Sequence, residues 1–396
     1  MRSNTAVTPT ILLLSAAVIA NGCAGLLYVL SLFILPIETA LGLSRADLGF
    51  ISSLALISFT SGVCVLPLLV ARVGRVPAAA LAFALIGGGH IAFGLDPSWR
   101  ALVLGYGIGF GAGSGLAYGF ALSLAAALDA RFRAISIGLA LGAFALSGIL
   151  LPILLGDWIL STPPGAAFLS IGWTTLGVGL VCVLALVAAA RPAPATGETE
   201  PPKPTAPSMD SPFALLFLIF FLICFIGLAI VSQAAAVAAA AGIMPAGYAA
   251  TALTLGYLGG SLLGAPLAER LGETKILLSL GCLAVLGSLL LLTKHPLPLF
   301  SGAAIVGMTF GGSGSVVPVL LGMRYGAENI SRLYGRAIIA YGLAGFLAPT
   351  VAGLLFDHAE SYAPLLALCA FFGLLVLIAT IFLVKLAKPS AGSDLV

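Results

Sequence analysis

The sequence predicts an all-α membrane protein with twelve transmembrane helices, arranged as two pseudo-symmetric six-helix bundles. Three observations lead to this fold class. The composition is strongly apolar, apolar segments of spanning length recur along the chain, and one long polar segment divides the chain into two parts of similar length. The two parts also repeat each other in sequence, as described below.

The composition is that of a membrane protein. Of the 396 residues, 61% are hydrophobic and 8% are charged, whereas soluble domains carry about 25% charged residues. A bilayer core needs roughly 20 apolar residues per helix, and stretches of that length occur in both parts. Segments of alternating polarity, which a membrane β-barrel requires, do not occur. The net charge of +3 is too small and too scattered to favour a nucleic-acid partner.

Residues 191–212 form the long polar segment between the two parts. Repeated prolines without apolar periodicity preclude a helix or a strand there, so we expect an extended, solvated linker. It separates a predicted N-terminal bundle, residues 1–190, from a predicted C-terminal bundle, residues 213–396. Helices are expected at 9–37, 46–70, 77–95, 101–127, 134–156, 166–190, 213–240, 246–268, 276–293, 297–322, 334–356 and 362–385.

The basic residues predict which helix ends share one side of the membrane. With both termini inside, the inner segments hold thirteen of the 17 Lys and Arg residues, and the outer segments hold Arg45, Arg100 and Lys294. The positive-inside rule then places both termini and the linker in the cytoplasm. Adding or removing one span would destroy this asymmetry. We therefore expect a multi-pass protein of the bacterial inner (plasma) membrane.

Catalytic and metal-binding signals do not accompany this pattern. The six cysteines lie in apolar helices without a CxxC pair, which is typical of small hydrophobic residues. No Ser-His-Asp set or phosphate loop occurs, so we expect no enzyme, no cofactor and no metal site. Gly107, Gly109 and Gly111 loosely match a GxGxxG pattern, but they lie within a membrane helix, where glycines serve close packing.

The two parts repeat each other at an offset of about 200 residues, which indicates a duplicated six-helix unit. Residues 111–115, Gly-Ala-Gly-Ser-Gly, match residues 311–315, Gly-Gly-Ser-Gly-Ser. The turn at 71–75, Ala-Arg-Val-Gly-Arg, matches the turn at 269–273, Glu-Arg-Leu-Gly-Glu.

These two turns resemble the G-x-L-a-D-r-x-G-r signature of the major facilitator superfamily, and the resemblance covers the whole chain once the spans and linker are included. In that family the turns help to set the access state, and the acidic residue helps to latch the two halves. The acidic position is Ala71 in the first turn and Glu269 in the second, so two alternatives are expected: a latch only around Glu269, or a weak latch. The other turn residues that the resemblance assigns to gating are Arg72, Gly74, Arg75, Arg270 and Gly272.

Within the superfamily, the chain resembles the branch of oxalate/formate antiporters and monocarboxylate transporters. The resemblance rests on residues 105–111 with Tyr118, on residues 133–142, and on Tyr334-Gly335 followed by residues 340–349 with their Gly-Phe-Leu-Ala-Pro ending. It implies a secondary transporter that moves a small organic anion, a monocarboxylate in particular, by alternating access. A co-transported proton (symport) or an exchanged anion (antiport) would be its partner, and we expect a monomer in the bilayer.

The resemblance also implies that helices 1, 4, 7, 8, 10 and 11 line a substrate cavity near the bilayer midplane. Polar side chains at that depth are costly unless they face a cavity or find a partner. The substrate-binding candidates are therefore Asn21, Tyr28, Tyr118, Gln233, Tyr257, Ser261 and Tyr341. Each has a structural alternative: a tyrosine can bond a neighbouring helix carbonyl or join an aromatic belt, and an amide can join two helices.

Charged groups are nearly absent from the predicted cavity. In the resembled branch, cationic residues on helices 8 and 11 pair with the carboxylate, but the corresponding positions here are about Ser261 and Tyr341. A dicarboxylate is therefore disfavoured. Arg336 is the one basic residue close to a lining helix. Its repeat partner Arg133 opens helix 5 in the same way, which favours a snorkelling or loop-binding role over an anion contact.

Titratable groups give few candidates for proton coupling. His90 is the one central group that titrates near neutrality, and because helix 3 is expected to be peripheral, a structural histidine is favoured over a proton carrier.

Glu38 and Asp47 flank the helix 1–2 turn with Arg45 between them. A solvated ion-pair cluster is favoured there over an outer gate.

Two other functions remain open. Export of hydrophobic or neutral compounds, as in drug efflux, is supported by the weakly charged cavity and opposed by the missing intramembrane carboxylate. A membrane sensor that transports nothing is the third hypothesis, and the shortness of the linker and tails speaks against it.

Overall fold

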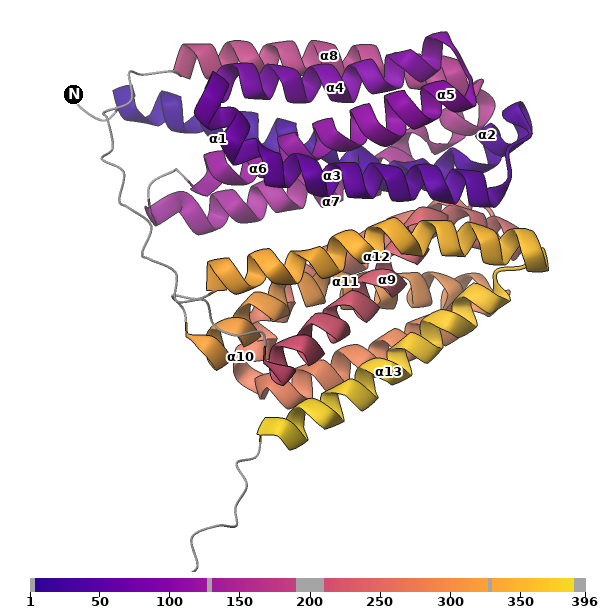
Figure 1. Ribbon diagram of the computed structural model, residues 1–396. Coiled ribbons are helices and arrows are strands. Elements are labelled where there is room, and N and C mark those ends of the chain that lie inside the picture. The colour runs from indigo at the N-terminus through magenta and orange to yellow at the C-terminus, as the bar shows by residue number, and fades with distance from the viewer. Residues whose placement is uncertain (1–3, 127–129, 190–209, 327–329, 388–396) are drawn as a thin grey trace, which may run out of the picture.

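The computed structural model describes residues 4–126, 130–189, 210–326 and 330–387. These residues are helical apart from short connections, so the prediction of an all-α fold is confirmed (Figure 1). The predicted linker, apart from residues 210–212, lies outside the described residues. The helices form two groups, one from each side of the linker, which lie against each other along their length (Figure 1).

The first group contains six spans, four of which are single helices, α3, α4, α7 and α8. The first span consists of an α-helix, a 3₁₀ segment and a second α-helix, and the fourth contains a π-helical segment. The elements are α1 (Asn4–Ala24), η1 (Gly25–Leu32), α2 (Ile34–Leu41), α3 (Arg45–Val73), α4 (Arg75–Leu95), α5 (Trp99–Ala101), η2 (Leu102–Phe110), α6 (Gly111–Ala126), α7 (Ala130–Ser161) and α8 (Pro164–Ala189).

The second group has fewer but longer elements. They are α9 (Ser211–Ala240), α10 (Gly247–Leu291), α11 (Pro296–Tyr325), α12 (Ile330–Ala359) and α13 (Ala363–Ala387). Eleven helical segments of the described chain are long and apolar enough to cross a membrane, and α10 is one of them with 45 residues. At 1.5 Å per residue it would be about 68 Å long, roughly twice the bilayer core, so it contains two spans.

A glycine divides α10 into its two spans and repeats a turn of the first group. Gly272 has φ 76° and ψ 167°, a conformation that interrupts the helix and that favours glycine. Gly74, between α3 and α4, has nearly the same conformation, with φ 87° and ψ 171°. The expected separate helices 246–268 and 276–293 therefore meet at this residue, and the twelve spans and their pseudo-symmetry are confirmed.

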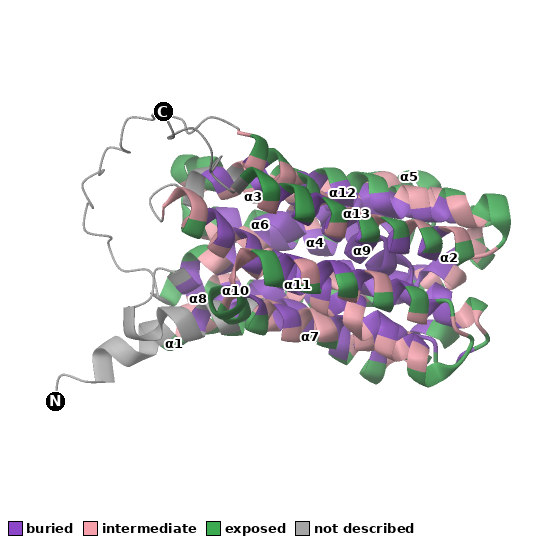
Figure 2. Ribbon diagram, turned by 90° about the horizontal axis from the view of Figure 1, so that it is seen from below, coloured by how far each residue is buried: buried purple, intermediate pink, exposed green. Residues whose placement is uncertain are grey.

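Burial differs between the helices. In α9, 72% of the most apolar window is buried, against 28% in α8. Figure 2 shows the buried residues along the interior and the exposed ones along the outer faces. Exposed apolar residues such as Leu104, Leu154 and Leu180 face outward, as expected for helices in lipid.

The two groups, called the N-terminal and C-terminal halves below, meet mainly through α3 against α12 and through α7 against α10. The end of the molecule at Ala189 and Ser211, where the halves are connected, is called the linker end. The opposite end, at α2 and the start of α3, is called the Arg45 end. The connection from α12 to α13 lies at this second end as well (Figure 1).

Candidate functional site

A cavity of about 280 Å³ lies between the two halves. Both halves contribute to its wall, through η1, α3, α6 and α7 on one side and α9 to α12 on the other. Its lining includes Cys64 and Leu262, which are exposed, and Tyr334 and Phe220, which lie near the starts of α12 and α9. The cavity thus extends toward the linker end.

Aromatic side chains make up nine of the 22 residues that line the cavity. Seven of them contact one another in a continuous series: Tyr118, Phe59, Phe144, Tyr28, Tyr257, Phe310 and Tyr341. The series crosses from one half to the other where Tyr28 on η1 meets Tyr257 on α10, with ring centroids 5.7 Å apart. Edge-to-face contacts of this kind hold the rings in fixed orientations. The cavity therefore has a preformed, largely apolar wall with phenolic hydroxyls.

The remaining polar groups of the wall are uncharged. Thr60, Ser313 and Ser315 donate their hydroxyl hydrogens to carbonyls of their own helices, at 2.7 to 3.1 Å. Their oxygens can still accept a hydrogen bond, and the tyrosines can donate one. Among the described residues that line the cavity there is no Asp, Glu, Lys, Arg or His. The cavity offers neutral hydrogen bonds and ring faces.

Five of the predicted binding residues lie together in this cavity. Tyr28, Tyr118, Tyr257, Ser261 and Tyr341 all line it, from four helical segments, η1, α6, α10 and α12. The other three candidates, Asn21, Gln233 and Arg336, are not part of its lining.

Asn21 and His90 have structural partners within the N-terminal half. The buried Asn21 amide donates to the carbonyl of Ala140 at 2.7 Å and so joins α1 to α7. His90 Nδ1 lies 2.8 Å from the carbonyl of Ile86, and its ring packs against Phe110 with centroids 4.7 Å apart. These contacts correspond to the structural alternatives for both residues. Arg336 is half-buried on α12.

The local structure at the start of α3 presents Arg45 toward the other half. Ser44 is the N-cap of α3, and its hydroxyl accepts from the backbone N–H of Asp47 at 3.1 Å while the Asp47 carboxylate accepts from the Ser44 N–H. This capping box fixes the first turn of the helix. The next two backbone N–H groups, of Arg45 and Ala46, have no partner within the helix. They donate instead to the two oxygens of Asp357 on α12, at 3.0 and 2.7 Å.

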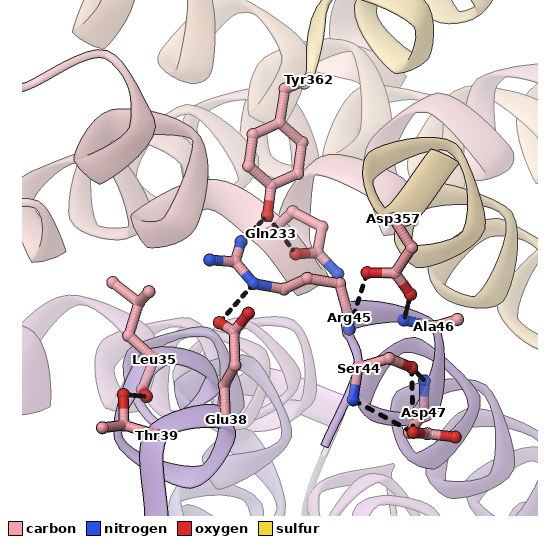
Figure 3. A network of polar contacts seen from close by, with 10 residues as sticks. All are labelled: Leu35, Glu38, Thr39, Ser44, Arg45, Ala46, Asp47, Gln233, Asp357 and Tyr362. Atoms are coloured by element: carbon pink, nitrogen blue, oxygen red, sulfur yellow. Dashed lines mark hydrogen bonds and ion pairs between the residues drawn. The ribbon is translucent and has the colours of Figure 1, made fainter. Parts of the chain in front are cut away.

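The Arg45 side chain lies at the centre of a cluster that contains residues of both halves (Figure 3). Its Nε donates to Glu38 at 2.6 Å, its Nη1 donates to the Tyr362 hydroxyl, and its guanidinium lies 4.3 Å from the centre of the Phe356 ring. The Tyr362 hydroxyl in turn donates to Gln233 Oε1 at 2.9 Å. We call Glu38, Arg45, Gln233, Asp357 and Tyr362 the Arg45 cluster.

The solvated ion pair expected at Glu38, Arg45 and Asp47 is therefore wrong. Arg45 is only 6% exposed, because the end of α12 and the α12–α13 connection cover it. Asp47 belongs to the helix cap and not to the ion pair. Gln233, expected at the substrate, bonds to Tyr362 in this cluster.

Close backbone contact reinforces the closure at the Arg45 end. A Cβ atom on Gly49 would lie 2.2 Å from the carbonyl oxygen of Pro349, and one on Gly353 would lie 2.2 Å from that of Arg45. One turn deeper, the Thr350 hydroxyl donates to Ser53 at 2.9 Å. Since α3 and α12 belong to different halves, these contacts seal the interface on this side of the cavity.

The predicted gating turns lie at the linker end. Arg72, Arg75, Glu269 and Arg270 are exposed beside Gly74 and Gly272. A nearby ion pair joins Glu273 to Arg324, at 2.5 Å, entirely within the C-terminal half. The contacts of the described residues thus give Glu269 no ion-pair partner in the other half, and its latch role remains a prediction.

Two groups of functional candidates were not predicted. Phe59, Phe144 and Phe310 were not predicted because, in an apolar helix, the sequence does not distinguish a phenylalanine that faces a cavity from one that faces lipid. Asp357 and Tyr362 lie more than 300 residues from Arg45, so no local pattern relates them.

The comparisons with known proteins agree with this architecture. A model of the Major Facilitator Superfamily matches residues 215–395. No curated protein matches the chain. A crystal structure of a bacterial homolog of the human lysosomal transporter Spinster, inward-facing and unoccupied, has a TM-score of 0.69 at 16% identity, covering 96% of this chain and 95% of that one. The fold is that of the major facilitator superfamily.

A second crystal structure of a bacterial Spinster homolog, inward-facing and occupied, has a TM-score of 0.65 at 16% identity and covers 97% of this chain and 95% of that one. The family match and both solved structures are those of transporters and not of enzymes. Neither comparison supports the oxalate/formate and monocarboxylate branch in particular.

Proposed function

We propose that the chain is a secondary transporter that moves a small, uncharged and largely apolar organic molecule by alternating access. The observation that carries this proposal is the cavity wall, where seven aromatic rings and neutral hydroxyls replace charged side chains among the described lining residues. A ring-lined wall suits apolar and aromatic groups, and hydroxyls at fixed positions orient a few polar atoms.

The closed Arg45 end and the cavity directed to the linker end support an inward-facing state for this structure. The positive-inside rule gives the same orientation, because Arg72, Arg75, Arg270, Lys275 and Arg324 lie near the linker end. On this view the linker end faces the bacterial cytoplasm. Transport requires the Arg45 end to open while the linker end closes.

A monocarboxylate is the second candidate, and the phenolic hydroxyls favour it. Tyr28, Tyr118, Tyr257 and Tyr341 can each donate to a carboxylate. A charge-assisted hydrogen bond contributes about 1.5–3 kcal/mol. Transfer of an ionised carboxylate into a site without a cation costs several kcal/mol, however, and the donors must first offset that cost. The neutral molecule is therefore the preferred substrate.

Thermal stability of the purified protein separates the two candidates, because a ligand that binds the folded state raises the unfolding midpoint. We expect neutral aromatic and aliphatic compounds to raise it more than monocarboxylates do. For a weak acid, the shift should grow as the pH falls toward the pKa of the acid, since the protonated form is the one bound. Tyr341→Phe should reduce the apparent affinity by about 2- to 10-fold, the value of one neutral hydrogen bond.

Tyr248→Phe is the matched control, because Tyr248 is exposed on α10 and does not line the cavity. Ligands that pass this screen are then tested for uptake into proteoliposomes. Stabilisation by ionised monocarboxylates alone, independent of pH and abolished in Tyr341→Phe, would overturn the neutral substrate in favour of the anion.

A further inference from the structure

Two irregular helical segments lie between the cavity and the Arg45 cluster. The eight residues of η1 form a 3₁₀ helix within the first span, and the nine residues of η2 form a π-helix within the fourth. Runs of either type are uncommon at this length and frequently mark functional positions. Here η1 carries Tyr28 and Ser31, and η2 carries Tyr106. Tyr28, Ser31 and Tyr106 line one small cavity together with Ser232 on α9 of the other half.

Ser31, Ser52, Tyr106 and Ser232 line a second, small cavity, which we call the hydroxyl pocket. All four side chains are more than nine-tenths buried. The Ser52 hydroxyl donates to Leu48 at 3.1 Å and the Ser232 hydroxyl donates to Ala229 at 2.9 Å. The hydroxyls of Ser31 and Tyr106 have no hydrogen-bond partner among the described residues. A buried hydroxyl without a partner is destabilising, so both groups call for a ligand within the pocket.

The pocket lies on the route between the central cavity and the Arg45 cluster. Tyr28 lines both the cavity and the pocket. Ser232 belongs to the C-terminal half and immediately precedes Gln233, which bonds to Tyr362 in the Arg45 cluster. Ser31, Ser52 and Tyr106 belong to the N-terminal half. When the halves separate at the Arg45 end, the pocket must therefore divide, and its four hydroxyls must meet the solution on that side.

The size and chemistry of the pocket select its ligand. Its volume of about 20 Å³ is the space of one water molecule. Of its eleven lining residues, the four named above and Tyr28 carry a neutral hydroxyl, the other six are apolar, and the described lining contains no carboxylate to compensate a cation. A sodium ion would lose its hydration shell without gaining a countercharge, whereas water can bond to Ser31, Tyr106 and the lone pairs of the other two hydroxyls.

We propose that Ser31, Ser52, Tyr106 and Ser232 form a second polar site on the transport path, which holds one water molecule while the Arg45 end is closed and becomes the polar wall of the open path when that end separates. The proposal rests on the alternating access of the proposed function, but not on the identity of the substrate. The tests below need no substrate, so they can fail independently of the neutral-substrate proposal.

The first test is cysteine accessibility. Ser31→Cys and Ser232→Cys are introduced singly into a variant without the six native cysteines and treated in proteoliposomes with a membrane-impermeant methanethiosulfonate. Both should react slowly while Arg45 is present. In Arg45→Ala, or in Gly49→Ala as a second way of opening this end, they should react faster by about tenfold or more, as expected for a shift in the population of open states.

Ser288→Cys is the matched control, because Ser288 is equally buried but lies within the C-terminal half, where its hydroxyl donates to Ala284. It should react slowly in every background. Equal reactivity of Ser31→Cys and Ser232→Cys with and without the opening substitutions would overturn the proposal. A parallel rise at Ser288→Cys would do the same, because it would show general unfolding.

The second test concerns the water molecule. Tyr106→Phe removes one of the two hydroxyls of the pocket that have no hydrogen-bond partner among the described residues. If the hydroxyl binds water, its loss should lower the unfolding midpoint; if the pocket is dry, removal of an unsatisfied group should raise it. A raised or unchanged midpoint contradicts the water site. A midpoint of the parent protein that depends on sodium and is lost in Tyr106→Phe would overturn it in favour of a cation.

Discussion

The central cavity and the Arg45 end differ in how they use charge. The cavity is walled by rings and neutral hydroxyls, whereas the Arg45 end joins the halves through an ion pair, a carboxylate on backbone N–H groups and an arginine over an aromatic ring. In the proposed mechanism, charge therefore stabilises one conformation and does not bind the substrate. We therefore expect substitutions at the Arg45 end to change the population of states, and substitutions in the cavity to change affinity.

The largest expected effect comes from Gly49→Ala. Its Cβ would lie 2.2 Å from the backbone carbonyl of Pro349, and α3 and α12 can relieve that overlap only by moving apart. Overpacking typically costs about 1–3 kcal/mol, which corresponds to roughly a 5- to 150-fold shift between closed and open states. Labelling of Cys64, in a variant where it is the sole cysteine, measures the shift, because Cys64 is exposed in the cavity of this state.

Labelling of Cys64 from the linker end should slow in Gly49→Ala as the open Arg45 end becomes populated. Gly177→Ala is the control, since a Cβ there meets nothing within 4 Å. If Cys64 reacts equally fast in both variants, the contact between Gly49 and Pro349 does not hold the closed state.

Arg45→Ala should have the next largest effect. It removes the donor to Glu38 and to Tyr362 and the stacking on Phe356, and it leaves their polar atoms partly buried. Hydrogen bonds to charged groups contribute about 1.5–3 kcal/mol. We therefore expect the population of the open state, relative to the closed state, to rise by about tenfold or more. Arg45→Lys should recover only part of this loss, because an ammonium group lacks the planar fork that contacts Glu38 and Tyr362 together.

Arg100→Ala is the matched control for Arg45→Ala, because Arg100 lies at the same end of the molecule, carries the same charge and is exposed. It should leave Cys64 labelling unchanged. An equal effect of the two substitutions would indicate that net charge at this end, and not the Arg45 cluster, determines the closed state.

The same comparison explains how much the sequence could predict. Hydropathy and charge predicted the twelve spans, because the bilayer imposes one length and one polarity on every helix. The tyrosines of the cavity were also predictable, since a polar group at that depth needs a cavity or a partner. These signals are local, and each can be seen within a single helix.

The Arg45 cluster could not be predicted because its partners are brought together only by packing. Glu38 and Arg45 are seven residues apart and were recognised as a pair, but Asp357 and Tyr362 approach from α12 and the α12–α13 connection. The burial that turns a surface ion pair into a closure is a property of the assembled halves. The irregular segments η1 and η2, which carry Ser31 and Tyr106, likewise left no pattern in an apolar sequence.

Tyr362→Phe should have the smallest effect and tests the chemistry of the Arg45 cluster most closely. Burial raises the pKa of Tyr362 to about 12, against the opposing influence of Arg45, so its hydroxyl is neutral and can donate to Gln233. Loss of this one hydroxyl should lower the free energy of unfolding by about 1 kcal/mol. Thermal unfolding of Tyr362→Phe and of the parent protein, compared across pH, measures that difference.

The sign of the pH dependence follows from the raised pKa. The folded protein binds the phenolic proton more tightly than the unfolded chain, whose tyrosine pKa is about 10, so the contribution of the hydroxyl is complete below pH 10 and is lost as the pH rises through 12. The difference between the thermal unfolding midpoints of the parent protein and of Tyr362→Phe should therefore be constant from about pH 6 to about pH 9. It should become smaller above about pH 10. Tyr248→Phe, at an exposed tyrosine, should show no such difference. A difference that changes between about pH 6 and about pH 9 would mean that the Tyr362 contact depends on a group that titrates near neutrality, which contradicts a closure built on the permanent charge of Arg45.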